Sequence, residues 1–172
     1  MAHKIFLLLV LMVTLFVSRA HAQFEYGHAY FGVHSGPTGV GAIGDQVGFG
    51  QGIALGLDVE AGVGRVGLGG LVDYYSYRDD YGYTKKFVDF LIPIQYHIEV
   101  CNSRWDPFLG FFIGYLAEDY YGKFADLGVG SSPKVGLSGG ARYFFNDNWA
   151  VQARLGAGFG YYLLALGIDY KL

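Results

Sequence analysis

The side chains of this chain that could take part in catalysis are few and poorly placed for it. His34 and Ser35 come nearest to a base and a nucleophile, and they are adjacent in the sequence. Adjacent residues of an extended strand point to opposite faces, so these two do not form a dyad. His28 and His34 would share a face, but no third metal ligand accompanies them at a suitable spacing. We therefore expect no catalytic, cofactor-binding or metal-binding residue and no cofactor.

Ionisable residues recur instead at alternate positions of extended segments. They are Asp58, Glu60, Asp73, Asp89, Glu99, Glu118, Arg142, Arg154 and Lys171. If the strands close around one another, this set shares an interior. Its structural interpretation is a network of paired charges, because a single buried charge is costly. Its functional interpretation is the selectivity lining of a small pore. Which one holds depends on the elements that carry these residues.

The first residues have the features of an export signal. Lys4 is followed by an apolar run over residues 5–17, which is too short to span a bilayer, and Ala20-His21-Ala22 forms a small-x-small cleavage site. We expect residues 1–22 to be a cleaved signal peptide and residues 23–172 to form one domain. Cys101 is the single cysteine, so an internal disulfide is excluded.

Composition argues against an ordinary globular surface. Charged residues make up 16% of the chain, against about 25% in typical domains. Glycine accounts for 28 of the 172 residues, and Tyr and Phe are also abundant. No basic patch is available to neutralise phosphates, so nucleic acid is not an expected partner.

The hydrophobic pattern has a period of two, which is typical of strands with two different faces. The clearest segment is 88–100, where Val88, Phe90, Ile92, Ile94, Tyr96, Ile98 and Val100 alternate with the residues between them. The same pattern predicts strands near residues 26–34, 53–61, 65–77, 108–118, 135–145, 149–159 and 162–172. Eight strands are an even number, as closed antiparallel membrane barrels require.

The composition of the second face of these strands indicates which face points into the barrel and which one faces outward. It is rich in glycine and would make a poor aqueous surface, whereas small and charged residues fit the narrow interior of eight strands. The bulky apolar set then faces lipid. The sequence therefore predicts an all-β fold, an eight-stranded antiparallel up-and-down transmembrane β-barrel.

Connections and aromatic residues agree with this prediction. Segments 35–48, 78–86 and 119–133 are long and polar, and short turns such as Asn146-Asp147-Asn148 alternate with them. Long connections lie outside the cell in such barrels. Trp105, Trp149 and Tyr170 fall near one rim, where aromatic girdles sit at the lipid headgroups.

The chain resembles the small outer-membrane β-barrel superfamily, which includes the OmpA transmembrane domain and OmpX-like proteins. The resemblance rests on the export signal, the eight alternating strands and the segment Gly139-Gly140-Ala141-Arg142-Tyr143-Phe144-Phe145-Asn146-Asp147-Asn148-Trp149. The C-terminal residues Gly167, Tyr170 and Leu172 are similar to the family's assembly signal, although the family usually ends in Phe. The resemblance implies an outer-membrane location and recognition by the barrel-assembly machinery.

These observations predict a non-enzymatic outer-membrane protein in contact with outer-membrane lipid. It would serve membrane structure or surface recognition through loops 35–48, 78–86 and 119–133, with a possible surface ligand. Asp58, Glu60, Asp89, Glu99, Glu118, Arg142 and Arg154 are expected to fill the lumen as a structural network. A small porin-like channel is the alternative, and a lipid-modifying enzyme a less favoured one.

Overall fold

A computed structural model describes residues 27–39, 52–78, 84–121, 129–158 and 161–172. The proposed signal peptide lies outside these residues. Eight strands follow one another along the chain: β1 (Ala29–Gly39), β2 (Gly52–Val63), β3 (Val66–Arg78), β4 (Thr84–His97), β5 (Trp105–Tyr121), β6 (Val129–Phe144), β7 (Trp149–Gly158) and β8 (Tyr161–Lys171). In the described part of the chain, no helix is long and apolar enough to cross a membrane.

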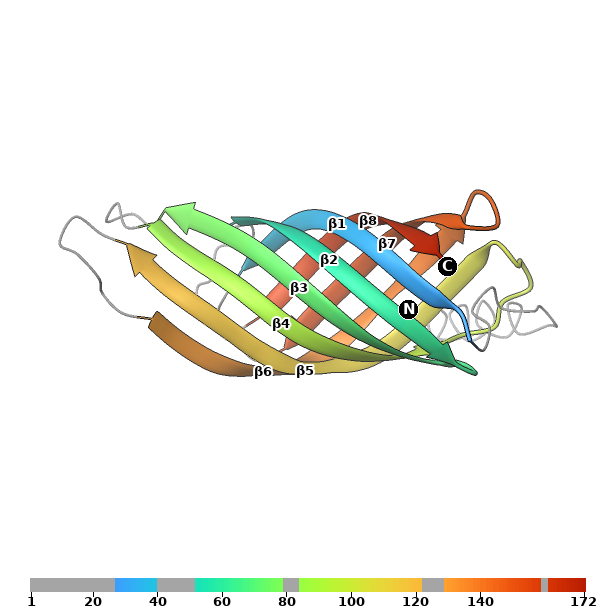
Figure 1. Ribbon diagram of the computed structural model, residues 1–172, viewed down its shortest axis with the longest axis horizontal. Helices are drawn as coiled ribbons and strands as arrows, with labels where there is room; N and C mark the ends of the chain where they lie inside the picture. The colour runs from blue at the N-terminus through green and yellow to red at the C-terminus, as the bar shows by residue number, and fades with distance from the viewer. Residues whose placement is uncertain (1–26, 40–51, 79–83, 122–128, 159–160) are drawn as a thin grey trace, which may run out of the picture.

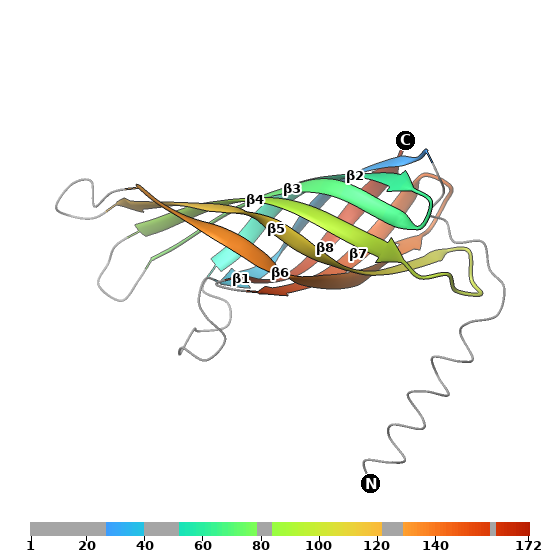
Figure 2. The same cartoon turned by 90° about the horizontal axis from the view of Figure 1, so that it is seen from below.

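The strands form a closed antiparallel barrel in sequence order, as the alternation predicts. Each strand pairs with the next, and β1 pairs with β8 to close the wall, with His34 opposite Gly167. Closure removes the exposed edges that an open sheet would present. The strands cross the long axis of the barrel at a steep tilt, which the two perpendicular views make visible (Figures 1 and 2).

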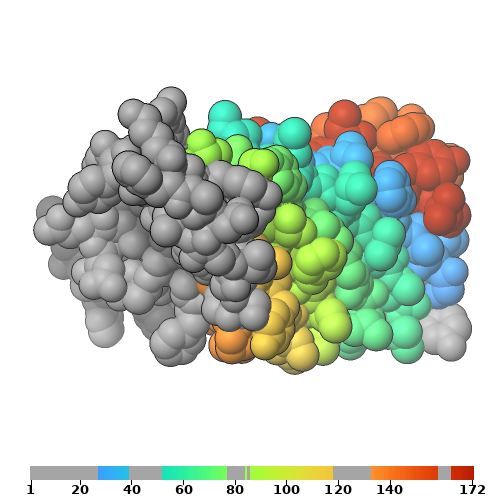
Figure 3. Space-filling model, turned by 60° about the vertical axis from the view of Figure 1, so that its left-hand side comes forward, coloured from blue at the N-terminus to red at the C-terminus, as the bar shows by residue number. Residues whose placement is uncertain are grey.

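The two faces of each strand differ as the pattern predicts. Along β2, every second residue from Ala54 to Gly62 is buried, while the apolar residues between them are exposed. β7 repeats this pattern between Ala150 and Gly156. In the space-filling view, the coloured side chains pack into a continuous wall on the face shown (Figure 3). The exposed face of the wall is bulky and apolar, whereas the buried face carries glycines and charged residues together with two apolar clusters.

One end of the barrel, here called the short-turn end, carries the compact connections 64–65, 98–104 and 145–148. Gly64 has a φ of +67°, in the left-handed region that glycine adopts without strain. Asn146 Oδ1 accepts hydrogen bonds from the backbone N–H groups of Asn148 and Trp149. At this end the Leu172 N–H also donates to the Ala29 carbonyl, which continues the β1–β8 pairing past the end of β8.

At the opposite end, here called the long-strand end, the strands run further than predicted. Residues 35–39, expected in a loop, belong to β1; residues 35–38 pair with β2, and Gly39 pairs with Tyr162 of β8. The β3–β4 and β5–β6 hairpins likewise extend to Arg78↔Thr84 and Asp119↔Val129. The expected connections 78–86 and 119–133 therefore shrink to 79–83 and 122–128. Backbone pairing continues where the hydrophobic alternation fades, so the pattern underestimates strand length.

The strand ends also differ at the short-turn end. The predicted strand 88–100 is displaced, since β4 begins at Thr84 and ends at His97. Ile98 and Val100 belong to the connection 98–104, although the Ile98 N–H still donates to the Pro107 carbonyl of β5. Because β4 ends at His97, the predicted lumen residue Glu99 lies in the connection and not in the strand.

Candidate functional site: the filled lumen

Arg142 occupies the centre of a carboxylate cluster inside the barrel. Its side chain is fully buried, and its guanidinium contacts three acids on three other strands: Glu60 of β2, Asp106 of β5 and Asp169 of β8. The Nη1–Oδ2 distance to Asp106 is 3.3 Å and the Nε–Oδ2 distance to Asp169 is 2.5 Å. Asp169 also accepts a hydrogen bond of 2.9 Å from the Gln152 side chain. The Arg142 guanidinium of β6 thus links β2, β5 and β8 across the interior of the barrel.

His97 extends this cluster on β4. Its Nδ1 lies 2.7 Å from Asp106 Oδ1 and its Nε2 lies 3.0 Å from Glu60 Oε1. Because a carboxylate only accepts, the arrangement suits an imidazolium that donates through both ring nitrogens. The chain of contacts Asp106–His97–Glu60–Arg142–Asp169 is therefore continuous, and each buried acid in it has a basic partner.

His34 organises a second cluster nearer the middle of the barrel. Its Nδ1 lies 3.1 Å from Asp58 Oδ1 and its Nε2 lies 2.7 Å from Asp73 Oδ1. Asp58 also accepts a hydrogen bond of 3.1 Å from Arg154 Nη2. All four side chains are buried. The two histidines have the same role, each lying between two carboxylates.

Glycines on the inner face leave the room that these clusters occupy. Gly32 pairs with Asp58 on one side and Asp169 on the other, and a Cβ at Gly32 would meet an oxygen of each at 2.5 Å. A Cβ at Gly56 would likewise overlap the side chains of His34 and Asp73. The glycine-rich inner face is thus complementary to the charged network.

Apolar side chains close the lumen on both sides of the network. Towards the long-strand end the buried cluster contains Ala54, Leu71, Tyr75, Phe87, Leu91, Phe112, Leu116 and Ala165. Tyr75 and Phe87 stack there with ring centroids 4.9 Å apart. Towards the short-turn end a second cluster contains Tyr30, Phe144 and Ala150. The interior is filled rather than open, as the narrow bore of eight strands leads one to expect.

The structure brings together four of the predicted lumen residues: Asp58, Glu60, Arg142 and Arg154. Asp89 of β4 is also fully buried, on the inner face. Glu99 was wrongly predicted: β4 ends at His97, so Glu99 lies outside the wall, where its exposed side chain pairs with Arg65 at 2.6 Å. The side chain of Glu118 lies outside the described part.

The prediction missed His34, His97, Asp106 and Asp169 as members of the network. His97 and Asp169 do lie on the glycine-rich face of their strands, so the alternation alone could have included them. Asp106 is the second residue of β5 and precedes the predicted strand 108–118. The favoured interpretation of His34 is a non-catalytic place in the lumen or at the rim, but no partner is assigned to it. Nothing in a single sequence shows which acid each histidine meets across the barrel.

Of the residues compared with an assembly signal, Gly167 and Tyr170 lie in β8 and Leu172 directly follows it. Gly167 faces inward, where a Cβ would come within 2.8 Å of His34 Cβ. Tyr170 packs against Trp149 with ring centroids 4.8 Å apart, and Leu172 is 70% exposed. Their recognition by assembly machinery stays a prediction.

The expected lack of a His–Ser dyad agrees with the geometry of β1. His34 points into the lumen, while the Ser35 hydroxyl donates to the Ala54 carbonyl at 2.9 Å. Among the described residues, no group of three or more His, Cys, Asp or Glu side chains could hold a metal ion.

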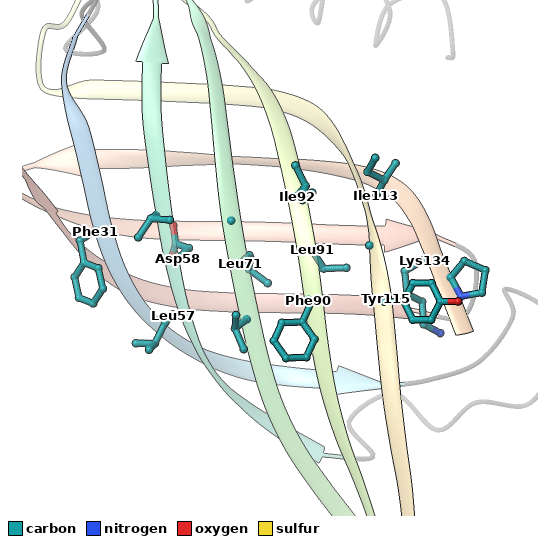
Figure 4. Close-up of a pocket in the computed structure, with 15 residues that line it drawn as sticks. Phe31, Leu57, Asp58, Leu71, Phe90, Leu91, Ile92, Ile113, Tyr115 and Lys134 are labelled. Carbon is teal, nitrogen blue, oxygen red and sulfur yellow. The ribbon is translucent and has the colours of Figure 1, made fainter. Parts of the chain in front are cut away.

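The outer surface of the wall is apolar around most of its circumference. Its exposed large side chains include Phe31, Leu57, Phe90, Ile113, Leu137 and Leu155. A shallow groove of about 910 Å³ runs across β1 to β6, flanked by Phe31, Leu57, Phe90 and Tyr115 (Figure 4). Water-soluble monomers rarely expose apolar patches beyond a few hundred Å². This surface suits hydrocarbon.

No protein-family model and no curated protein matches the sequence. Several solved structures match the fold. Neisserial surface protein A is 13% identical with a TM-score of 0.70, covering 85% of this chain and 99% of that one. OprG of Pseudomonas aeruginosa is 12% identical with a TM-score of 0.65, covering 88% and 99%. Ail, the attachment invasion locus protein of Yersinia pestis, is 11% identical with a TM-score of 0.61, covering 86% and 100%. These likenesses confirm that the chain has the fold of the small outer-membrane barrels.

Proposed function

We propose that the protein is a non-enzymatic integral outer-membrane barrel with a closed lumen, whose working surface is the long-strand end. The observation that carries this proposal is the filled interior. Ion pairs centred on Arg142 and His34 and the apolar cluster around Leu91 and Phe112 occupy the space that a channel would need. Transport through the lumen is thereby disfavoured, and the exposed end becomes the main candidate for function.

The outer-membrane location is supported by the distribution of side chains on the wall. The apolar surface around Leu57 and Phe90 matches the lipid-facing band of such barrels. Trp105 packs near Tyr143, and Trp149 near Tyr170, at the short-turn end. Amphipathic rings at one rim are typical of the membrane–water interface.

The long-strand end offers an extended surface for recognition. β5 and β6 pair as far as Asp119↔Val129, whereas the β6–β7 ladder reaches only Gly136↔Gly158 in the described chain. This hairpin therefore extends beyond β7 and β8 (Figure 1). Among the described residues, no strand pairs with the side of residues 129–133 that faces away from β5, so an extended segment could pair there. The similar protein Ail is named for attachment, and one of its structures contains a heparin analogue, which supports a recognition role for this fold.

A cysteine-labelling experiment tests the orientation that this function requires. Cys101 is exposed in the connection 98–104 of the short-turn end. In intact Gram-negative cells, a membrane-impermeant maleimide should leave Cys101 unlabelled until the outer membrane is permeabilised. A Cys101→Ser, Asp80→Cys variant, with its cysteine between β3 and β4, should be labelled without permeabilisation. The reverse pattern would place the long-strand end in the periplasm and contradict the proposal.

Recognition itself is tested by shortening one hairpin. Glu118 and Gly130 are paired across β5 and β6, so residues 119–129 can be replaced by Asn-Gly, a favoured two-residue hairpin loop. Cells producing the protein should attach to an immobilised protein or sulfated-glycan surface on which control cells do not, and this variant should lose the attachment. A Cys101→Ser variant is the control at the other end. Equal attachment by both variants would contradict a role for this hairpin.

A further inference from the structure

A small cavity inside the lumen gathers buried polar atoms that have no partner in the protein. Its volume is about 20 Å³, and its polar lining comes from Gln95, Ser138 and Arg154. All three residues are more than nine-tenths buried. Among the described residues, no hydrogen-bond partner is present for Gln95 Nε2 and Oε1, Ser138 Oγ, or Arg154 Nε and Nη1. Buried polar groups are nearly always satisfied, so each of these atoms needs an explanation.

The strand register explains why the cavity forms at this level. Gln95 of β4 pairs with Gly110 of β5, which pairs with Ser138 of β6, which pairs with Gly156 of β7. The two glycines in this row contribute no side chain, while Gln95 and Ser138, on either side of Gly110, are buried on the inner face. Arg154 completes the lining, although its Nη2 is already bonded to Asp58.

We propose that this cavity is a binding site for one internal water molecule shared by Gln95, Ser138 and Arg154. A buried water needs roughly 10–15 Å³ of such space and two to four polar partners. The cavity provides both. One water accepts two hydrogen bonds from the amide and guanidinium N–H groups and donates two, to acceptors such as Gln95 Oε1 and Ser138 Oγ, so it combines the two roles that this lining requires.

The charge of the surroundings argues against an anion in the same place. Six acids are buried among the described residues: Asp58, Glu60, Asp73, Asp89, Asp106 and Asp169. The buried basic residues number five: His34, His97, Lys134, Arg142 and Arg154. Even with every base protonated, carboxylates are in excess and would repel a halide. A halide also has no proton to donate to Gln95 Oε1.

A crystal structure of the barrel, grown in bromide at a resolution that shows ordered water, tests the proposal directly. We expect one oxygen-sized density peak within hydrogen-bonding distance of Gln95, Ser138 and Arg154, without anomalous scattering. An anomalous bromide peak would overturn the assignment to water. An empty cavity, or a direct Gln95–Arg154 hydrogen bond that fills it, would overturn the site itself.

Nuclear magnetic resonance provides a second test in solution. The side-chain amide of Gln95 should show a cross-peak to a long-lived water in the unmodified protein. Ser138→Val places methyl groups in the cavity, so this cross-peak should be lost. Ser35→Val is the matched control, because the Ser35 hydroxyl bonds the Ala54 carbonyl away from the cavity. Loss in the control alone, or retention in Ser138→Val, would contradict the proposal; if Ser138→Val does not fold, the crystal structure decides.

Discussion

Arg142 and Asp169 meet inside the barrel with Nε and Oδ2 2.5 Å apart, although β7 lies between their strands. Gln152 of β7 donates to the same oxygen of Asp169, so three consecutive strands converge on one carboxylate. Glu60 adds β2 through its own contact with Arg142. The interior thus stabilises the barrel across its diameter, in addition to the hydrogen bonds along its wall.

Removing Arg142 should be strongly destabilising. In Arg142→Met the carboxylates of Glu60, Asp106 and Asp169 lose their shared cation while remaining buried. Breaking a buried pair by deleting one partner costs about 3–5 kcal/mol. The free energy of unfolding, measured by urea titration of the barrel folded in lipid vesicles, should fall by about this amount.

Arg65→Met is the matched control for that variant. Arg65 forms its ion pair with Glu99 at the exposed short-turn end, where water screens the charges. Its loss should leave the unfolding midpoint nearly unchanged. Equal effects of the two substitutions would show that the Arg142 network does not stabilise the barrel.

A methyl group at Gly56 should be poorly tolerated. It would overlap the side chains of His34 and Asp73, which are fixed by their hydrogen bond. Overpacking of this kind costs about 1–3 kcal/mol. In Gly70→Ala on the outer face, the new methyl meets only Val59 Cγ2 at 3.7 Å, so this control should unfold like the unmodified protein. The two urea midpoints compare directly, and indistinguishable values would refute the tight fit around His34.

A charge placed at the middle of the outer wall tests whether lipid covers it. Leu57 and Val63 are both exposed on β2, at 51% and 61%, but Val63 lies at the short-turn end. Leu57→Arg should lose about 2–4 kcal/mol in vesicles, because arginine at the bilayer midplane is costly, and Val63→Arg about 0–1 kcal/mol. Unfolding titrations of both variants provide the measurement. A wall in contact with water would tolerate both substitutions alike.

Strand number, antiparallel order and the inside-out placement of side chains could be predicted because they depend on local alternation. Leu57 and Asp58 face opposite sides whatever their neighbours are, and the glycine-rich face identifies the interior. Cross-barrel partners could not be predicted in this way. That Glu60 meets Arg142, 82 positions later, follows from the tilt and register of strands, which a single sequence does not show.

The error at Glu99 has a related cause. Its alternation continues smoothly from Gln95 and His97, but β4 ends at His97 and Glu99 lies in the connection 98–104. Alternation indicates the face of a residue only while the strand lasts. Strand ends depend on pairing with β3 and β5, so they are determined by contacts distant in the sequence.

The closed lumen is tested most directly by single-channel recording in planar bilayers. Purified, folded barrel should be inserted, with insertion checked by protection of its strands from protease. We predict no stable conductance steps, because the Arg142 and His34 networks and the apolar cluster around Phe112 fill the bore. Reproducible steps of uniform size from the unmodified protein would contradict a closed lumen and favour a small channel.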